Sequence, residues 1–88
     1  MIWKVELSDI ALNNLKKMDK KTAAMIIGYV EKKLVGEIDP RSFGKPLVGN
    51  QKSKWRYRIG DYRLLCQILD TKIRILVVAI GHRKDIYK

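Results

Sequence analysis

The sequence is poor in the residues that build disulfides, metal centres and membrane spans. Its 88 residues include one cysteine, Cys66, and one histidine, His82. A single thiol forms no internal disulfide, and these two residues make no metal-ligand set, so we expect no metal and no cofactor. No apolar run reaches the ~20 residues that span a bilayer. Because the first residues lack the apolar segment of a secretory signal, we expect a soluble, cytoplasmic protein.

Acidic residues are also scarce, and the imbalance lies in one half of the chain. The sequence has 19 Lys and Arg against 9 Asp and Glu, a net charge of +10. Residues 1–40 carry seven basic and six acidic side chains, whereas residues 41–88 carry twelve and three, a difference of +9. Nucleic acid is the commonest partner for such a field, followed by an acidic protein. A membrane surface is less favoured, because the basic half contains no amphipathic basic helix.

The first half of the chain has the pattern of a strand followed by two helices. Residues 2–7 alternate between apolar and polar side chains, as in a half-buried strand. Ser8 and Asp19 each precede an apolar stripe at helical spacing and are predicted to cap a helix, and Gly36 is predicted to end the second one. Asn13 and Asn14 are expected to face solvent. The predicted stripes are Ala11, Leu12, Leu15 and Met18, then Ala23, Ile26, Ile27, Val30 and Leu34.

Residues 54–63 are predicted to form a hairpin whose two faces differ in chemistry. By the alternation of strand side chains, Trp55, Tyr57 and Ile59 share one face. A two-residue Gly60–Asp61 turn would place Arg58 directly opposite Arg63, where like charges repel. Long cationic side chains can also splay into solvent, but four on one face favour a site for a polyanion. The four are Lys54, Arg56, Arg58 and Arg63.

The remaining segments complete the predicted fold. Residues 37–53, rich in Gly and Pro, are expected to be a long connection rather than an element, bringing Arg41, Lys45 and Lys52 toward the hairpin. A strand over residues 62–69 and a tight Asp70–Thr71 turn lead into a last strand that begins at Ile73. Residues 1–88 therefore form one α+β domain with an N-terminal strand, a two-helix hairpin and a three-stranded antiparallel meander in one mainly antiparallel sheet.

The alternation also assigns the faces of the last two strands. Tyr62, Leu64, Cys66 and Ile68 are expected beneath the helices with Ile73, Ile75, Val77 and Ala79. Arg63, Leu65 and Gln67 are expected on the other face with Leu76, Val78 and Ile80. This second face is basic along one strand and apolar along the next, which suits a groove that binds a phosphate backbone, a partner protein or each in turn.

Two phrases, taken in order, resemble a known family. They are Trp55-Arg56-Tyr57-Arg58-Ile59-Gly60-Asp61-Tyr62-Arg63 and Gly81-His82-Arg83-Lys84-Asp85-Ile86-Tyr87, and the likeness extends over nearly the whole chain. The sequence resembles the RelE branch of the RelE/ParE toxin superfamily. That resemblance implies a toxin of a type II toxin–antitoxin system that enters the ribosomal A site, against 16S rRNA, and cuts mRNA there. It further implies a cognate antitoxin as partner.

The resemblance also implies roles for individual residues. Arg56, Arg58, Arg63 and Arg83 fall where such enzymes place their basic cluster, and Tyr87 matches the tyrosine near it. Arginine is a poor general base, because its pKa exceeds ~12. His82, Lys52 and Lys54 remain as candidates for the base. Arg41, Lys45, Lys52 and Lys54 are expected to contact RNA.

Two other functions remain open on the same sequence. A ParE-like toxin would block DNA gyrase and cut nothing. A basic RNA-binding module would grip phosphates without cleaving them. An acidic antitoxin is expected to cover the basic face together with Leu65, Leu76 and Val78.

Overall fold

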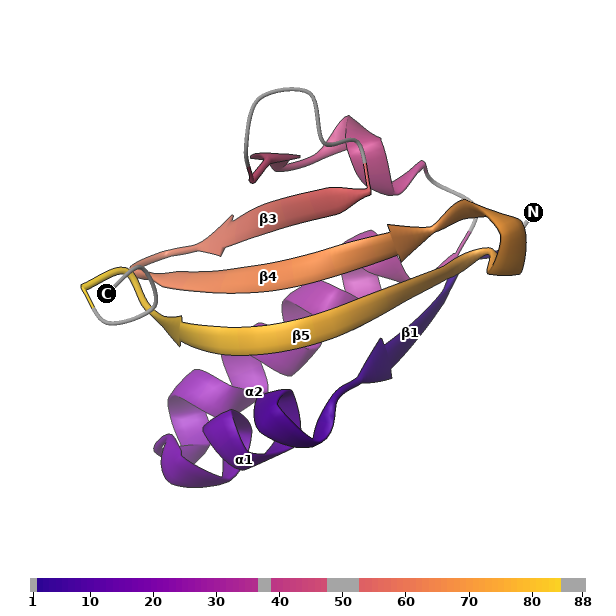
Figure 1. The fold of residues 1–88 in the computed structure, drawn as a ribbon. Helices are drawn as coiled ribbons and strands as arrows, with labels where there is room; N and C mark the ends of the chain where they lie inside the picture. The colour runs from indigo at the N-terminus through magenta and orange to yellow at the C-terminus, as the bar shows by residue number, and fades with distance from the viewer. Residues whose placement is uncertain (1, 37–38, 48–52, 85–88) are drawn as a thin grey trace.

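The computed structural model describes residues 2–36, 39–47 and 53–84. Two helices pack on one face of a five-stranded sheet in the order β1-β5-β4-β3-β2 (Figure 1). β1 runs parallel to β5, and the other neighbours are antiparallel. This is the α+β arrangement that the sequence predicts, with one added strand. The elements are β1 (Lys4–Leu7), α1 (Asp9–Lys17), α2 (Lys20–Tyr29), β2 (Lys45–Pro46), β3 (Lys54–Ile59), β4 (Tyr62–Leu69) and β5 (Arg74–His82).

Both helices begin at the predicted caps. The side chain of Ser8 accepts a hydrogen bond from the Ala11 amide, and that of Asp19 accepts one from the Thr22 amide. The second helix continues beyond α2 as a π-helical turn, Val30–Leu34. Gly36 then takes a φ of +125°, which glycine adopts at little cost. No helix in the described residues is long and apolar enough to cross a membrane.

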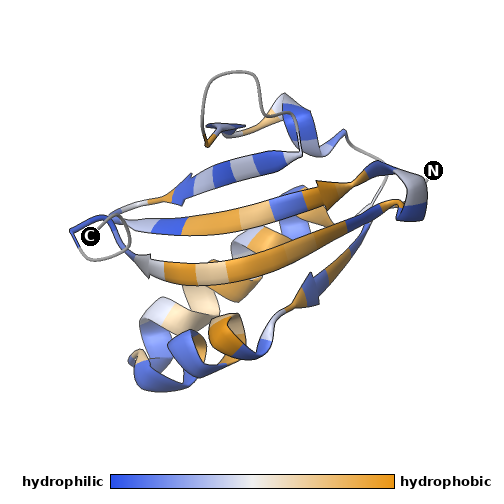
Figure 2. Cartoon of the chain, viewed as in Figure 1, coloured by the Kyte–Doolittle hydropathy of each residue, from blue (hydrophilic) through white to orange (hydrophobic). Residues whose placement is uncertain are grey.

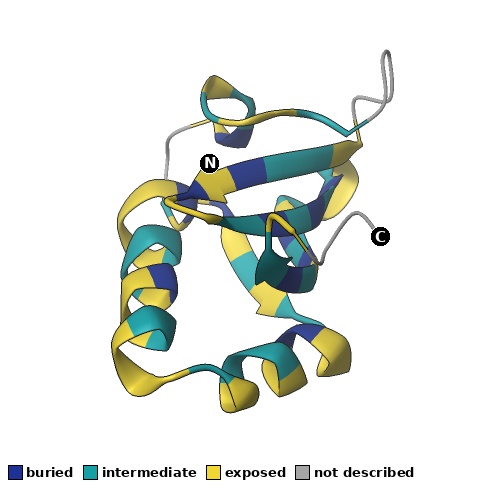
Figure 3. Ribbon diagram, turned by 90° about the vertical axis from the view of Figure 1, so that its left-hand side faces the viewer, coloured by how far each residue is buried: buried dark blue, intermediate teal, exposed yellow. Residues whose placement is uncertain are grey.

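The hydrophobic core lies between the helices and the sheet (Figure 3). Most of the predicted apolar stripe residues contribute to it, but Leu12, Ala23 and Ile27 do not. Leu12 and Ile27 are 41% and 43% exposed, respectively. The buried apolar residues are Trp3, Ala11, Ile26, Leu34, Tyr57, Ile59, Leu64, Cys66, Ile68, Ile75, Val77 and Ile80.

Residues at the start of α1 cover the edge of β5 beyond the point where β1 ends. The Ser8 hydroxyl donates to the Val78 carbonyl over 2.6 Å. Asn14 Oδ1 accepts from the Ile80 amide over 2.9 Å. The expectation of a solvated Asn14 was therefore wrong, because its side chain replaces the missing strand partner of β5.

The connection after Gly36 contains structure that the sequence did not predict. A 3₁₀ turn, Pro40–Ser42, leads into β2, which pairs with β3. The Tyr57 hydroxyl donates to the Pro40 carbonyl over 2.7 Å, and Trp55 Nε1 donates to the Phe43 carbonyl. These two side chains fasten the connection to the edge of the sheet.

The second turn and the strand after it differ from the predicted register. Asp70–Lys72 forms a 3₁₀ turn instead of a two-residue turn, and Ile73 adopts a left-handed φ of 52° before β5 begins. Gln67 pairs with Leu76 as the alternation predicts, but a β-bulge follows between Leu65 and Cys66.

The bulge exchanges the two faces of β5 from that point onward. Leu65 pairs with Ala79 rather than Val78, and Ile80 pairs with Leu64 in the core, where it is 3% exposed. The predicted positions of Ala79 under the helices and of Ile80 on the open face were therefore wrong. One extra residue in a strand reverses the facing of every residue after it.

Candidate nucleic-acid interface

The predicted hairpin is present, and its polar face points away from the helices. Ile59 pairs with Tyr62 and Arg58 with Arg63 around a Gly60 of φ 58°. Hydrophilic and less polar residues alternate along β3 (Figure 2). The fully buried Tyr57 marks the core side of this strand. Three cross-strand pairs thus share the open face: Arg58 with Arg63, Arg56 with Leu65, and Lys54 with Gln67.

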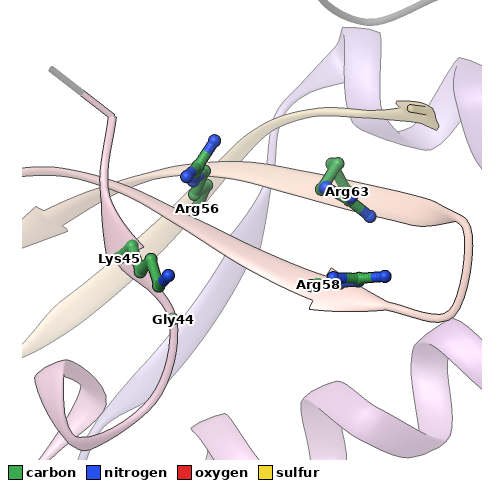
Figure 4. A pocket seen from close by; sticks show the side chains of 5 residues that line it. All are labelled: Gly44, Lys45, Arg56, Arg58 and Arg63. Atoms are coloured by element: carbon green, nitrogen blue, oxygen red, sulfur yellow. The ribbon is translucent and has the colours of Figure 1, made fainter. Parts of the chain in front are cut away.

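A pocket of about 250 Å³ opens among the cations of this face. It is lined by Gly44, Lys45, Arg56, Arg58 and Arg63 (Figure 4). The four charged side chains come from β2, β3 and β4, so the pocket draws together residues that lie up to 18 positions apart in the sequence. We call this hollow the cationic pocket.

Two of the arginines in the cationic pocket have no acidic partner among the described residues. Arg63 Nη1 donates to the carbonyls of Gly60 and Tyr62, over 3.3 and 3.1 Å. Within the described part of the chain, neither Arg58 nor Arg63 forms a salt bridge with a carboxylate. Adjacent guanidinium groups without counter-charge repel each other, and a bound phosphate would relieve this repulsion with charge-assisted hydrogen bonds.

Gly44 determines where Lys45 enters the cationic pocket. Its φ is +70°, and a Cβ atom there would lie 2.2 Å from the Arg56 carbonyl oxygen. Only glycine permits this close approach of the connection to β3. Lys45 then pairs with Arg56 across β2 and β3, as the expected approach of Lys45 to the hairpin requires.

Arg83 lies beside the hairpin turn. Its amide donates to the Asp61 carbonyl over 2.8 Å, and its Nε lies 3.8 Å from Asp61 Oδ1. The chain after β5 is thereby held at the end of the sheet where Arg58 and Arg63 pair. The Arg83 side chain is about half exposed.

Two predicted site residues lie apart from the cationic pocket. His82 pairs with Tyr62 and packs edge-on against its ring at 5.4 Å, on the helix side of the sheet. Without the bulge, His82, as an even-numbered residue of β5, would lie on the open face with the arginines. Arg41 instead forms a bidentate salt bridge with Asp70, over 2.8 and 2.9 Å, next to the β4–β5 turn. This contact lowers the pKa of the Asp70 carboxyl.

The remaining predicted residues divide into two groups. Lys54 is exposed and lies on the open face opposite Gln67, in line with Arg56 and Arg58. Lys52 and Tyr87 lie outside the described residues, so their expected roles remain predictions. In the described ranges, no three His, Cys, Asp or Glu side chains gather where they could hold a metal ion.

Sequence reasoning did not single out a second hollow on the same face. It has a volume of about 450 Å³ and is lined by Leu47, Lys54, Leu65, Cys66, Gln67 and Val78. We call it the apolar pocket. The sequence placed Leu65, Gln67 and Val78 together on the open face, but it did not predict the pocket, because the pocket also depends on the bulge and on β2.

Comparison with known proteins assigns the family. A family model described as the ParE toxin of the parDE type II toxin–antitoxin system matches residues 5–87. The chain belongs to this toxin family, within the RelE/ParE superfamily. It is therefore a toxin of a type II toxin–antitoxin system.

Individual relatives of this toxin carry RelE-type names. It is 30% identical to Toxin RelG of Mycobacterium tuberculosis, over all of this chain and 99% of the relative. It is 28% identical to Toxin RelE of the same organism, over 98% of this chain and 87% of the relative. Among solved structures, the RelBE2 toxin–antitoxin complex of M. tuberculosis matches with a TM-score of 0.81 at 27% identity, covering 97% of this chain and 95% of that one.

The fold extends to more distant proteins. A chain of the archaeal RelE–RelB complex from Pyrococcus horikoshii matches with a TM-score of 0.72, covering 97% of this chain and 99% of that one. Its sequence identity is 18%, so this match shows the fold alone.

Proposed function

We propose that this toxin is a ribosome-dependent endoribonuclease that cleaves mRNA in the ribosomal A site. The observation that carries the proposal is the cationic pocket, where Lys45, Arg56, Arg58 and Arg63 surround a space large enough for a phosphate group. The RelE-type names of its relatives support the same activity.

The proposed reaction is an in-line attack within the RNA. The ribose 2′-hydroxyl loses its proton and its oxygen bonds to the adjacent phosphorus, while the bond from phosphorus to the 5′-oxygen breaks. Negative charge grows on the phosphorane oxygens, and fixed guanidinium groups stabilise it. Arg58 and Arg63 supply this stabilisation from opposite strands, and Arg83 reaches the same end of the sheet from the chain after β5.

The proton acceptor is proposed to be a lysine rather than His82. Lys54 shares the open face with the arginines, two positions from Arg56 on β3. Lys52 is the other candidate. His82 packs against Tyr62 on the side of the sheet opposite the arginines. Its Nδ1 accepts a hydrogen bond from the Lys84 amide over 3.2 Å. Tyr87 is proposed to stack on a base or orient the ribose.

The activity is tested by mapping transcript ends in a translating extract with wild type, Arg63→Ala and Arg83→Ala. Removing one charge-stabilising donor costs about 10²- to 10³-fold in rate, so each variant should lose nearly all cleavage. Arg74→Ala is the matched control. It removes the same charge, but Arg74 contacts Glu6 at the other end of β5. Thermal unfolding verifies that each variant folds. Cleavage that survives both site substitutions would contradict the proposal.

A gyrase-directed toxin is the second candidate, because the matching family model is described as ParE. Uncut transcripts together with inhibited supercoiling by gyrase would favour it. RNA binding without cleavage or gyrase inhibition would leave only the RNA-binding module.

We also propose a cognate acidic antitoxin as partner, as in the RelB-containing complexes formed by its structural relatives. Such a protein would neutralise the cationic pocket and cover the neighbouring Val78, which is 38% exposed. Hydrogen exchange on the toxin with and without antitoxin measures this. Protection should appear on β3 and β4, and unchanged exchange there would contradict the proposed coverage.

A further inference from the structure

The apolar pocket adjoins the cationic pocket along the same two strands. The Arg58–Arg63, Arg56–Leu65 and Lys54–Gln67 pairs follow one another on the open face, with about 7 Å between successive pairs. Leu65 and Gln67 line the apolar pocket, whereas Arg56, Arg58 and Arg63 line the cationic one. An RNA strand gripped at the cationic pocket and running along β3 would therefore pass over the apolar pocket.

The β-bulge shapes the wall of this pocket. Val78 is the residue without a cross-strand partner on β4, since Cys66 pairs with Val77 and Leu65 with Ala79. It lines the pocket and remains 38% exposed. Bulges commonly redirect a side chain beside a binding site. The opposite wall is Leu47, which is held by its amide's hydrogen bond to the Lys54 carbonyl over 3.0 Å.

The lining matches the chemistry of an unstacked base. Leu47, Leu65 and Val78 offer apolar contact to a ring face, while Lys54 and Gln67 offer polar groups to its edge. A Gln amide pairs in bidentate fashion with N6 and N7 of adenine, and a Lys ammonium reaches N7 and O6 of guanine. Single-stranded RNA presents such bases splayed out of the stack.

We propose that the apolar pocket binds a purine base flanking the phosphate held in the cationic pocket, and that Gln67 selects for it. This inference rests on the proposed function in that the same RNA strand occupies both pockets. An antitoxin segment is the competing occupant. RNA is favoured because Lys54 and Gln67 face each other directly and because the cationic pocket is contiguous.

The first test measures cleavage of a reporter set in a translating extract. The bases flanking the cut are varied one at a time, and wild type is compared with Gln67→Leu. Wild type should prefer a purine at one flanking position, and Gln67→Leu should reduce that preference by about tenfold. Asn13→Leu, which removes an exposed amide on α1, should keep the wild-type preference. Cleavage with no base preference, or with a preference unchanged by Gln67→Leu, overturns the inference and leaves the nuclease proposal intact.

The second test separates the base site from the nuclease activity. Fluorescence anisotropy measures binding of the free protein to short oligouridines that carry one adenosine or one cytidine. Adenosine should strengthen binding to wild type and not to Gln67→Leu. If this holds while no transcript is cut, the base site stands and the nuclease proposal fails. If Gln67→Leu weakens antitoxin binding but leaves both RNA measurements unchanged, the pocket binds protein and the inference fails.

Discussion

Gly44 is the residue on which the shape of the cationic pocket depends most directly. The connection approaches β3 so closely that a methyl group would overlap the Arg56 carbonyl and crowd Trp55 Nε1, at 2.8 Å, as well. The same residue holds a positive φ. Backbone geometry at this one position therefore places the only charged side chain that β2 contributes to the pocket, Lys45.

Gly44→Ala should lower both stability and function. A non-glycine residue at positive φ costs about 1–3 kcal/mol, and the overlap adds to this because β2 must move away from β3. Urea unfolding measures the loss. Gly28→Ala is the matched control, since a Cβ atom there meets no atom within 4 Å. In a helix interior that change should stabilise by about 0.5–1 kcal/mol. Equal effects of the two substitutions would contradict the argument.

Asp70 gives the protein an acid-sensitive contact. Hydrogen bonds from Arg41 lower the pKa of its carboxyl, so the charged form is favoured in the folded state. The resulting stability is fully present above the unfolded pKa of ~3.9 and is lost as pH falls through the lower folded value.

Asp70→Asn should therefore destabilise the protein at neutral pH and much less in acid. The Asp70 side chain is 59% exposed, so solvent screens the pair and we expect about 0.5 kcal/mol at pH 7. Thermal unfolding at pH 7 and at strongly acidic pH measures the difference between wild type and variant. A difference that stays constant across this range would show that the salt bridge contributes nothing.

Among the elements, α1 and its N-cap residue also hydrogen-bond to the edge of the sheet. Ser8 accepts from the Ala11 amide while its hydroxyl donates to Val78, and Asn14 accepts from Ile80. Because β5 extends beyond the end of β1, the Val78 carbonyl and the Ile80 amide would otherwise have no partner on this edge. The helix thus completes the sheet where β1 stops.

Asn14→Ala should destabilise the protein by about 1–3 kcal/mol, because the part-buried Ile80 amide loses its acceptor. Asn13→Ala changes the same residue type one position earlier, where the side chain is exposed, and should alter stability by less than about 0.5 kcal/mol. Chemical unfolding of the two variants provides the comparison. Similar free energies of unfolding for the two variants would show that the Asn14 hydrogen bond does not stabilise the protein.

The β3–β4 hairpin could be predicted from sequence, whereas β2 and the bulge could not. Alternation around Gly60–Asp61 is local, and the observed register follows from it. β2 has two residues and includes Pro46, so no periodic pattern marks it, and its pairing depends on Trp55 and Tyr57 from a distant segment. The bulge leaves no trace in a pattern of mostly apolar residues.

The same contrast applies to the candidate site. Arg56, Arg58 and Arg63 were predictable as one cluster because a tight turn fixes their pairing. The separation of Arg41 depends on its partner Asp70, 29 residues later. The placement of His82 depends on the bulge. Tertiary contacts of this kind are not encoded in local periodicity.

At the scale of the whole molecule, the helices and the basic face lie on opposite sides of the sheet. This separation leaves the cationic pocket open while the core is covered. The net charge of +10 should draw RNA to the protein from a distance, and the pocket should fix where it binds.

RNA binding should therefore weaken steeply with salt. Single strands contribute a slope of about −0.7 per phosphate contact in a plot of log affinity against log salt, so the four pocket cations predict about −2 to −3. Arg58→Ala should reduce the magnitude by about 0.7, whereas Arg74→Ala should not change it. Anisotropy titrations over a salt series provide the slopes. Equal slopes for both variants would show that RNA binds elsewhere.

The parallel pairing of β1 with β5 sets the order in which the molecule can be completed. Within the described residues, residues 4–7 find their one strand partner in residues 74–77, and β4 also has β5 as one of its two neighbours. A nascent chain still lacking residues 74–82 therefore lacks the strand that joins β1 to β4. We therefore expect the toxin to complete its sheet only after the ribosome has translated residues 74–82.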